Sequence, residues 1–500
     1  MYNLHFTCQS AGSKLLIFKR IRPFHRRRVF SLRVTANRKL YTSRQILDRK
    51  PDSKSLDHIR PFRESVVTVR ISDEEGGEVF ASDEEPHFLT PKQGFGFNPL
   101  KLGEHLQDGQ VLGNEYEVVR KLGFGANSSV WLVNFSDNST EKHFLALKVL
   151  TVNMTAGIVY GKYLELSSAR RVADANPNHP GYRHCLILRD SFVSDSYHGP
   201  HMSLVFDVLG SDMLSLQRQQ PNHVFPLHIT KRIIKQVLLA LDYLHRDCGL
   251  VHRDVKPQNI MVAMNPSDAT ISDYLDKNPA APYEPRIEPD LSADPIITVK
   301  SQPLPDFGLH STLDNLVVKL ADYGEAIPVE KIDAEEECQP ILLRAPEVIL
   351  GHQYSTPIDI WSVGCLVFEY LIGTPLFQLY ESPSVSVADS HLQRMIELLG
   401  GFTPNFLSDC RNRADYFDEK GQNSQIFPVS ITLIQIIVGE LLRVKKLFPR
   451  TIEECIAHYG CLEDKDIVPA ATFIRRCLTI DPSLRPSASE LMQDEWLSDI

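Results

Sequence analysis

The stretch Val251-His-Arg-Asp-Val-Lys-Pro-Gln-Asn-Ile260 decides the fold of this chain. It follows apolar residues spaced at three and four between Ile233 and Leu244, a pattern that predicts one amphipathic helix ending near His245. A carboxylate, an ammonium and an amide then follow at fixed spacing, supplied by Asp254, Lys256 and Asn259. This arrangement directly after a helix is too specific to arise by chance.

Two aspartates downstream are each followed by an aromatic residue and a glycine, in Asp306-Phe-Gly308 and Asp322-Tyr-Gly324. We choose Asp322 as the metal-binding candidate, because it follows a strand-like run at 316–321 and lies 23 residues before Ala345-Pro-Glu347. Asp306 lies in a proline-rich stretch with no strand before it. The pattern is completed by Asp359, which begins an apolar helix, and by Arg485 in Asp481-Pro-Ser-Leu-Arg485.

Upstream, the pattern predicts short antiparallel strands at 116–122, 129–133 and 144–150. The first two flank Leu122-Gly-Phe-Gly-Ala-Asn-Ser-Ser-Val130, whose glycines let the backbone lie close over a chain of phosphates. Lys148 lies inside the apolar third run, where an unpaired ammonium is costly. Glu165 is its candidate partner.

Together these motifs resemble those of the eukaryotic protein kinases over residues 116–497. The resemblance implies an α+β, bilobal fold, with a small β-rich N-lobe at about 116–209 and a larger helical C-lobe at about 210–500. It also implies use of ATP and Mg²⁺, and transfer of phosphate to protein hydroxyls. Lys256, two residues after Asp254, is the feature of the serine/threonine type.

The same resemblance implies a role for each site residue. Asp254 would accept the proton of the substrate hydroxyl, and Lys256 would neutralise the transferring phosphoryl group. Asn259 and Asp322 would bind Mg²⁺, while Lys148, paired with Glu165, would hold the α- and β-phosphates. The other nucleotide-binding residues expected are Leu122, Gly123, Gly125, Ser128, Val130, Ala146, Asp207 and Leu209.

Finer features are similar to the branch that contains the SR-protein kinases, particularly their fungal relatives. They are Asn98-Pro-Leu-Lys-Leu-Gly103, His179-Pro-Gly181, Val205-Phe-Asp-Val-Leu-Gly210 and Leu343-Arg-Ala-Pro-Glu-Val-Ile349. A proline-rich insert at about 264–315, expected to be a surface excursion, falls where that branch carries its spacer. The branch implies protein substrates rich in Arg and Ser.

The chain departs from the family pattern at two positions. Ser128 replaces the third glycine, and Pro340 stands about where the family has a threonine that bonds the catalytic Asp and Lys. The segment 324–344 contains no Ser, Thr or Tyr but six acids, Glu325, Glu330, Asp333, Glu335, Glu336 and Glu337. We therefore expect activity without phosphorylation of this segment. The acids either attract basic substrates or only aid solubility.

Composition is that of a soluble globular protein, with 43% apolar and 23% charged residues. No apolar run reaches the roughly 18 residues of a membrane span; the best, at 429–442, carries Gln435 and Glu440. Nine scattered cysteines without a Cys-x-x-Cys pair indicate reduced, intracellular thiols. The net charge is −10, yet residues 1–70 alone carry +13.

We therefore divide the chain into a basic arm at 1–71, an acidic linker at 72–97 and a kinase domain at 98–500. The first 47 residues are rich in Arg and contain no Asp or Glu, as in mitochondrial transit peptides. A disordered basic arm that binds anionic surfaces, and an upstream extension irrelevant to the fold, are the two competing interpretations, and together they are favoured. Cytoplasm and/or nucleus is therefore the expected location, with the mitochondrion as the alternative. No direct nucleic-acid binding is expected.

Two other functions compete with an active protein kinase. One is a pseudokinase that binds partners as a scaffold, favoured only by Ser128 and Pro340. The other is a small-molecule kinase on a related fold, against which the Ala345-Pro-Glu347 element, Asp359 and Arg485 argue.

Overall fold

The computed structural model describes strands 31–36, 67–72 and 78–80, and residues 84–107, 115–136, 143–287, 294–333, 335–418, 441–444 and 446–500. Most of the expected basic arm, part of the acidic linker and the apolar run at 429–440 lie outside the described residues. The chain divides into two compact units, one of residues 1–166, 187–211 and 264–308, and the other of 167–186, 212–263 and 309–500. None of the helices in the described ranges is long and apolar enough to cross a membrane.

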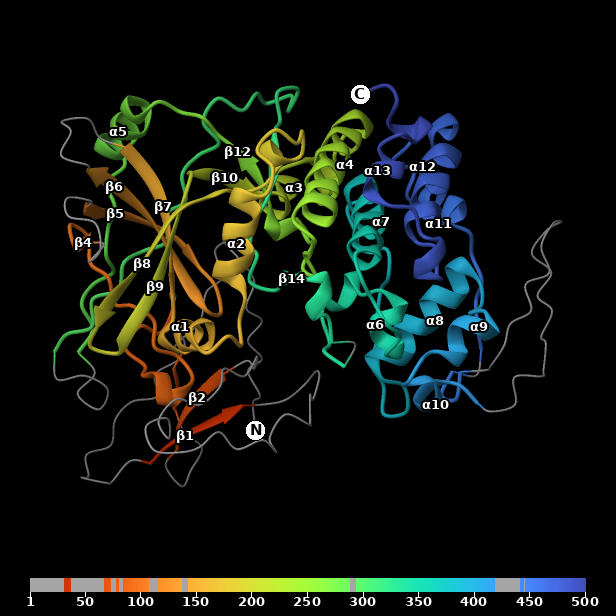
Figure 1. Cartoon of the computed structure of the whole chain (residues 1–500), viewed down its shortest axis with the longest axis horizontal. Coiled ribbons are helices and arrows are strands. Elements are labelled where there is room, and N and C mark those ends of the chain that lie inside the picture. The colour runs from red at the N-terminus through yellow and green to blue at the C-terminus, as the bar shows by residue number, and fades with distance from the viewer. Residues whose placement is uncertain are drawn as a thin grey trace. The chain divides into compact units, whose positions relative to one another are not determined.

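The first unit is built on a six-stranded antiparallel sheet in the order β4-β5-β6-β7-β9-β8 (Figure 1). The predicted strands are confirmed as β5 (Glu115–Phe124), β6 (Ser128–Ser136) and β7 (His143–Leu150). The other elements are β4 (His105–Gln107), β8 (Leu188–Ser196), β9 (Gly199–Phe206), α1 (Val152–Val159) and α5 (Asp268–Lys277). A separate antiparallel sheet joins β1 (Ser31–Ala36), β2 (Val67–Ser72) and β3 (Glu78–Phe80).

Alternation along β5 explains how this sheet packs. Tyr116 and Val118 are buried, whereas their neighbours are half-exposed, so one face of the strand joins the core. That core also contains Trp131, Leu147 and Val205 from the neighbouring strands. The sheet is thereby a rigid support for the turn between β5 and β6.

The second unit is mainly helical, as expected. The predicted amphipathic helix is α4 (Leu227–Asp242), followed by a π-helical turn at Tyr243–Asp247, and the predicted apolar helix is α7 (Pro357–Ile372). Both helices are buried along most of their length. The remaining helices are α3 (Met213–Arg218), α6 (Pro346–Leu350), α8 (Val387–Leu399), α9 (Pro404–Ser408), α10 (Arg413–Tyr416), α11 (Ile452–Tyr459), α12 (Asp464–Cys477) and α13 (Ala488–Leu491).

Short strands of this unit frame the quoted stretch. β11 (Leu250–Val251) pairs with β14 (Ile327–Pro328), and β12 (Ile260–Ala263) pairs with β13 (Val318–Leu320), both antiparallel. The stretch 252–259 therefore forms a loop held at both ends. The elements α2 (Glu165–Asp174) and β10 (Leu209–Asp212) continue from the residues of one unit into those of the other.

Two expectations about the flanking segments differ from the structure. Glu84 and Glu85, in the expected solvated linker, are 3% and 2% exposed and belong to the first unit. The expected surface insert includes helix α5 and buries Ile271, Val299 and Leu304 in the same unit. Composition suggested solvation in both cases, but specific partners on the sheet make burial favourable.

Candidate active site

The turn between β5 and β6 is tight and open on its outer side. Gly125 N donates to Ser128 O over 2.8 Å, which closes the turn. A Cβ placed on Gly125 would meet no atom within 4 Å other than those of Gly125 and its two chain neighbours. Ser128, which replaces the family's third glycine, is 7% exposed and continues into β6. The substitution is thus accommodated without disturbing the strand pair.

Lys148 and Glu165 form the ion pair that the sequence predicts. Lys148 Nζ donates to Glu165 Oε1 over 2.5 Å, with the side chains 18% and 5% exposed. β7 places Lys148 opposite Val130 of β6, and Glu165 is the first residue of α2. Because the carboxylate balances the ammonium in a partly buried place, the lysine is held with its charge.

The other expected nucleotide-binding residues of this unit lie along the same strands and the segment after β9. Ala146 pairs with Phe206, and Leu122 packs against a buried cluster that includes Val208. Asp207 is held by Arg189, whose Nε and Nη2 each donate to its carboxylate over 2.9 Å. Leu209 begins β10.

In the second unit, the catalytic-loop groups converge on one carboxylate oxygen. Lys256 Nζ donates to Asp254 Oδ2 over 2.5 Å, and Asn259 Nδ2 donates to the same oxygen over 2.8 Å. A further bond of 2.9 Å from Asn259 Nδ2 to Asp254 O fixes the amide. The three residues that the sequence singles out therefore form a single cluster.

Asp359 of α7 anchors the loop at 252–259 through hydrogen bonds to its first two residues. It is fully buried and accepts from His252 N at 2.8 Å, from Arg253 N at 2.9 Å and from His245 Nε2 at 2.9 Å. Burial alone would raise the pKa of Asp359, but the hydrogen bond and charge of His245 hold that pKa below its usual value. The anchor allows Arg253 to keep φ at 68°, in the left-handed region.

The electrostatics of the cluster favour a proton-accepting carboxylate. Burial raises the pKa of Asp254, Lys256 opposes the rise, and the charge of Asp322 adds to it. Burial lowers the pKa of Lys256, but Asp254 more than offsets this and leaves that pKa raised. Lys256 thus remains an ammonium, beside a carboxylate that is more basic than a free one.

Asp322 and Asp306 lie in different surroundings. Asp322 lies close enough to Asp254 and Lys256 to shift the pKa of both, and its φ of 65° is in the left-handed region. Asp306 belongs to the first unit, where its Oδ1 accepts from Ser211 N at 2.6 Å. The Asp306-Phe-Gly308 sequence therefore attaches the insert to Ser211 through this hydrogen bond.

A buried glutamine that the sequence did not reveal shapes the segment after Asp322. Gln339 has φ of 66°; its amide donates to Ile358 O over 2.8 Å and to Ser362 Oγ over 2.9 Å, and accepts from Ala345 N at 2.9 Å. These bonds attach the segment to α7. Nothing in the local pattern distinguishes this glutamine from a solvated one, because its partners lie 6 to 23 residues away.

Two ion pairs complete the second unit. Arg253 Nη1 lies 2.9 Å from Glu336 Oε2 in the acidic segment. Glu347 and Arg485 have fully buried side chains and form an ion pair of 2.7 Å. Both pairs hold the segment between Asp322 and α6 against the rest of the unit.

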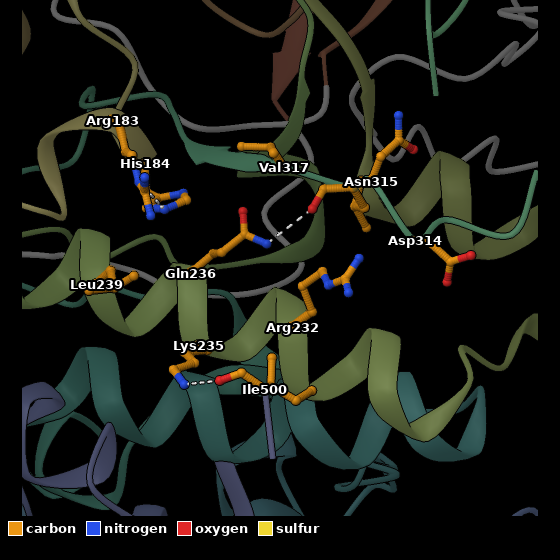
Figure 2. Close-up of a pocket in the computed structure, with 11 residues that line it drawn as sticks. Arg183, His184, Arg232, Lys235, Gln236, Leu239, Asp314, Asn315, Val317 and Ile500 are labelled. Carbon is orange, nitrogen blue, oxygen red and sulfur yellow. Dashed lines mark hydrogen bonds between the residues drawn. The ribbon is translucent and has the colours of Figure 1, made fainter. Parts of the chain in front are cut away.

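A cavity of about 500 Å³ lies elsewhere in the second unit, beside α4 (Figure 2). Its walls include Arg232, Lys235 and Gln236 of α4 and the segment 314–317, to which Gln236 Nε2 donates at Leu316 O over 3.2 Å. None of the expected site residues lines it.

Comparison with known proteins agrees with this geometry. The family model of the protein kinase domain matches residues 116–275 and 309–497, well over half of the chain. The chain belongs to the protein kinase family. The unmatched residues 276–308 lie inside the insert that the sequence predicts.

Its curated relatives include kinases of the SR-protein type. The serine/threonine-protein kinase SRPK of Physarum polycephalum is 29% identical over 85% of this chain and 94% of its own length. Protein kinase dsk1 of Schizosaccharomyces pombe is 25% identical over 81% and 84%, and SRSF protein kinase 3 of Mus musculus is 24% identical over 81% and 89%. The chain is thus a serine/threonine protein kinase of the SR-protein-kinase-like type, in a family that uses ATP.

Proposed function

We propose that this kinase transfers the γ-phosphate of ATP, with Mg²⁺, to serine or threonine hydroxyls in Arg/Ser-rich proteins. The convergence of Lys256 and Asn259 on Asp254 Oδ2 carries the proposal for catalysis. The substrate class rests on the similarity to the mouse relative, an SRSF protein kinase, and on the resemblance of the sequence motifs.

The chain's own groups suit each step of such a transfer. Asp254, with its raised pKa, accepts the proton of the substrate hydroxyl, and Lys256 stabilises charge on the transferring phosphoryl group. Lys148, held by Glu165, supplies a cation for the nucleotide phosphates. No covalent intermediate with the protein is needed.

Oxygen donors suit a hard cation in this unit. The amide nitrogen of Asn259 donates to Asp254. The amide oxygen of Asn259 and the carboxylate of Asp322 are hard ligands of the kind that Mg²⁺ prefers. The cation, when bound, would neutralise phosphate charge.

The structure gives little support to the interpretation that the acidic segment at 324–344 attracts arginines of the substrate. Glu330, Glu335, Glu336 and Glu337 each lie beside an arginine of this chain, at 3.2, 2.8, 2.9 and 3.5 Å respectively. Part of the segment's charge is therefore paired within the molecule, which lowers the negative charge that it presents to a substrate.

Transfer of labelled phosphate tests the proposal. We expect wild type with Mg²⁺ to label an Arg-Ser-repeat protein but not an acidic control protein. Asp254→Ala and Asp322→Ala should abolish the labelling. Asp306→Ala, which changes the other aspartate that is followed by an aromatic residue and a glycine, is the matched control and should retain it. A folded, ATP-binding protein that labels no protein substrate would favour the scaffold function instead.

A further inference from the structure

Lys121 carries a fully buried ammonium beside the glycine-rich turn. It lies in β5, one residue before Leu122, and its side chain is 0% exposed. Its Nζ donates to Glu84 Oε2 over 2.8 Å and also to Glu85 Oε2. The two carboxyl groups are 3% and 2% exposed, so all three ionisable groups have left water. Such a cluster is stable only when its members satisfy one another.

The insert completes the cluster from another part of the chain. Ser301 donates to Glu84 twice, from N to Oε1 over 2.7 Å and from Oγ to Oε2 over 2.6 Å. Gln302 N donates to Lys121 O over 2.9 Å, beside a parallel bridge between Lys121 and Ser301. The segment at 84–85 and the insert at 301–302 are thus joined on one residue of β5. Both segments lie outside the residues that match the kinase family model.

The ammonium also reaches the turn itself. Lys121 Nζ lies 5.0 Å from the centre of the Phe124 ring and 5.8 Å from that of Trp131, within the range of cation–π attraction. Phe124 stands between Gly123 and Gly125. The register of β5 with β6 is irregular between Lys121 and Gly123, so ladder hydrogen bonding alone does not fix the start of the turn.

We propose that Lys121 is a positioning residue for nucleotide binding, which holds Phe124 and thereby the glycine-rich turn in place. Glu84, Glu85 and Ser301 hold the ammonium beneath the ring. The role rests on the proposed function, since it concerns the turn that would cover the phosphates. Through Lys121, the segments at 84–85 and 301–302, which lie outside the residues that match the kinase family model, support the nucleotide site.

Binding of a fluorescent ADP analogue with Mg²⁺ to the full chain tests this role without a protein substrate. The variant Lys121→Met/Glu84→Gln/Glu85→Gln removes all three ionisable groups together, which avoids leaving an unpaired charge in the interior. We expect its Kd for the nucleotide to rise about tenfold. Phe124→Leu should raise the Kd similarly, and combining the two should add little, because both remove one contact.

Two controls separate positioning from general stability. Asp268→Asn loosens a different attachment of the insert, at His143 Nδ1 (3.2 Å) and Phe144 N (2.9 Å), and should leave the Kd unchanged. Phe124→Tyr keeps an aromatic ring over the ammonium, so it should raise the Kd less than Phe124→Leu does. Thermal melting of every variant shows that it is folded.

Unchanged affinity in the folded triple variant would overturn the proposal, as would losses that simply add to those of Phe124→Leu. Should the triple variant not fold, Phe124→Leu and Phe124→Tyr still decide: equal affinity in both overturns the role. Wild type that binds no nucleotide would instead overturn the proposed function, and the positioning role with it.

Discussion

Arg253 Nη1 lies 2.9 Å from Glu336 Oε2, so the arginine next to the catalytic aspartate pairs with an acid of the chain itself. The Arg253 side chain is 4% exposed and Glu336 is 56% exposed. Burial alone would lower the pKa of Arg253, but neighbouring groups that include Glu336 leave it raised, which keeps the guanidinium charged. The segment thus supplies negative charge next to Arg253 from one of its own side chains, without an added phosphate.

This pair leads us to expect activity without phosphorylation of the segment at 324–344, which has no hydroxyl side chain. Protein treated with a phosphatase should retain its kcat. Glu336→Ala should lower kcat about tenfold, because a hydrogen bond to a charged group is worth about 1.5–3 kcal/mol. Steady-state turnover measures both effects.

Glu335→Ala is the matched control for this experiment, since Glu335 pairs with Arg411 at 2.8 Å and not with Arg253. It should leave kcat near the wild-type value. Equal losses in both variants, or a large gain after treatment with an upstream kinase that modifies 324–344, would contradict the expectation.

The sequence predicts groups whose partners are set by short motifs. Asp254, Lys256 and Asn259 lie within six residues, and the periodic spacing of apolar residues before them predicts the helix. The choice of Asp322 over Asp306 likewise depends on local pattern, because a strand-like run precedes only Asp322. Local pattern was sufficient to predict that Asp254, Lys256 and Asn259 lie together, because the loop between two short strands positions them.

The sequence did not reveal the Lys121 cluster or the role of Gln339. Ser301 and Glu84 are 217 residues apart, and a run of acids is ordinarily solvated. Only the fold brings a buried ammonium to Glu84 and Glu85. In the same way, burial of Gln339 becomes favourable through its hydrogen bonds to Ile358 O, Ser362 Oγ and Ala345 N.

The buried pair of Glu347 and Arg485 predicts a large loss of stability when one partner is removed. Both side chains are 0% exposed, and the two are joined by bonds of 2.7 and 3.1 Å. Glu347→Gln leaves Arg485 charged in the interior, so we expect a loss of about 3–5 kcal/mol. Urea unfolding measures it. Glu453→Gln, which breaks an exposed pair with Arg475, should cost less than about 1 kcal/mol; a similar loss in both variants would contradict the argument.

Pro340 predicts a gain of activity on substitution. Its φ of −58° and ψ of 139° are open to threonine, so Pro340→Thr introduces a hydroxyl without backbone strain. The family resemblance places that hydroxyl where it can bond Asp254 and Lys256. One added hydrogen bond should raise kcat about two- to tenfold. Pro340→Ala controls for loss of the ring, and equal kcat for the alanine and threonine variants would show that the hydroxyl does not reach the pair.

Glu369 in α7 predicts how stability depends on pH. Burial raises its pKa from the usual 4.5 to about 7, so the folded state favours the protonated carboxyl. The stability contributed by that proton is complete below about pH 4.5 and is lost as the pH rises through about 7, by about 3 kcal/mol at most. Glu369→Gln, a neutral side chain of the same shape, should therefore stabilise the protein at pH 8 and change little at pH 5.

Urea unfolding of wild type and Glu369→Gln at pH 5 and pH 8 measures this difference in stability. Glu453, whose pKa is lowered by Arg475 against the effect of burial, should show the opposite sign on substitution by Gln at pH 8. A gain for Glu369→Gln that is equal at pH 5 and pH 8 would mean that the carboxyl does not titrate in this range.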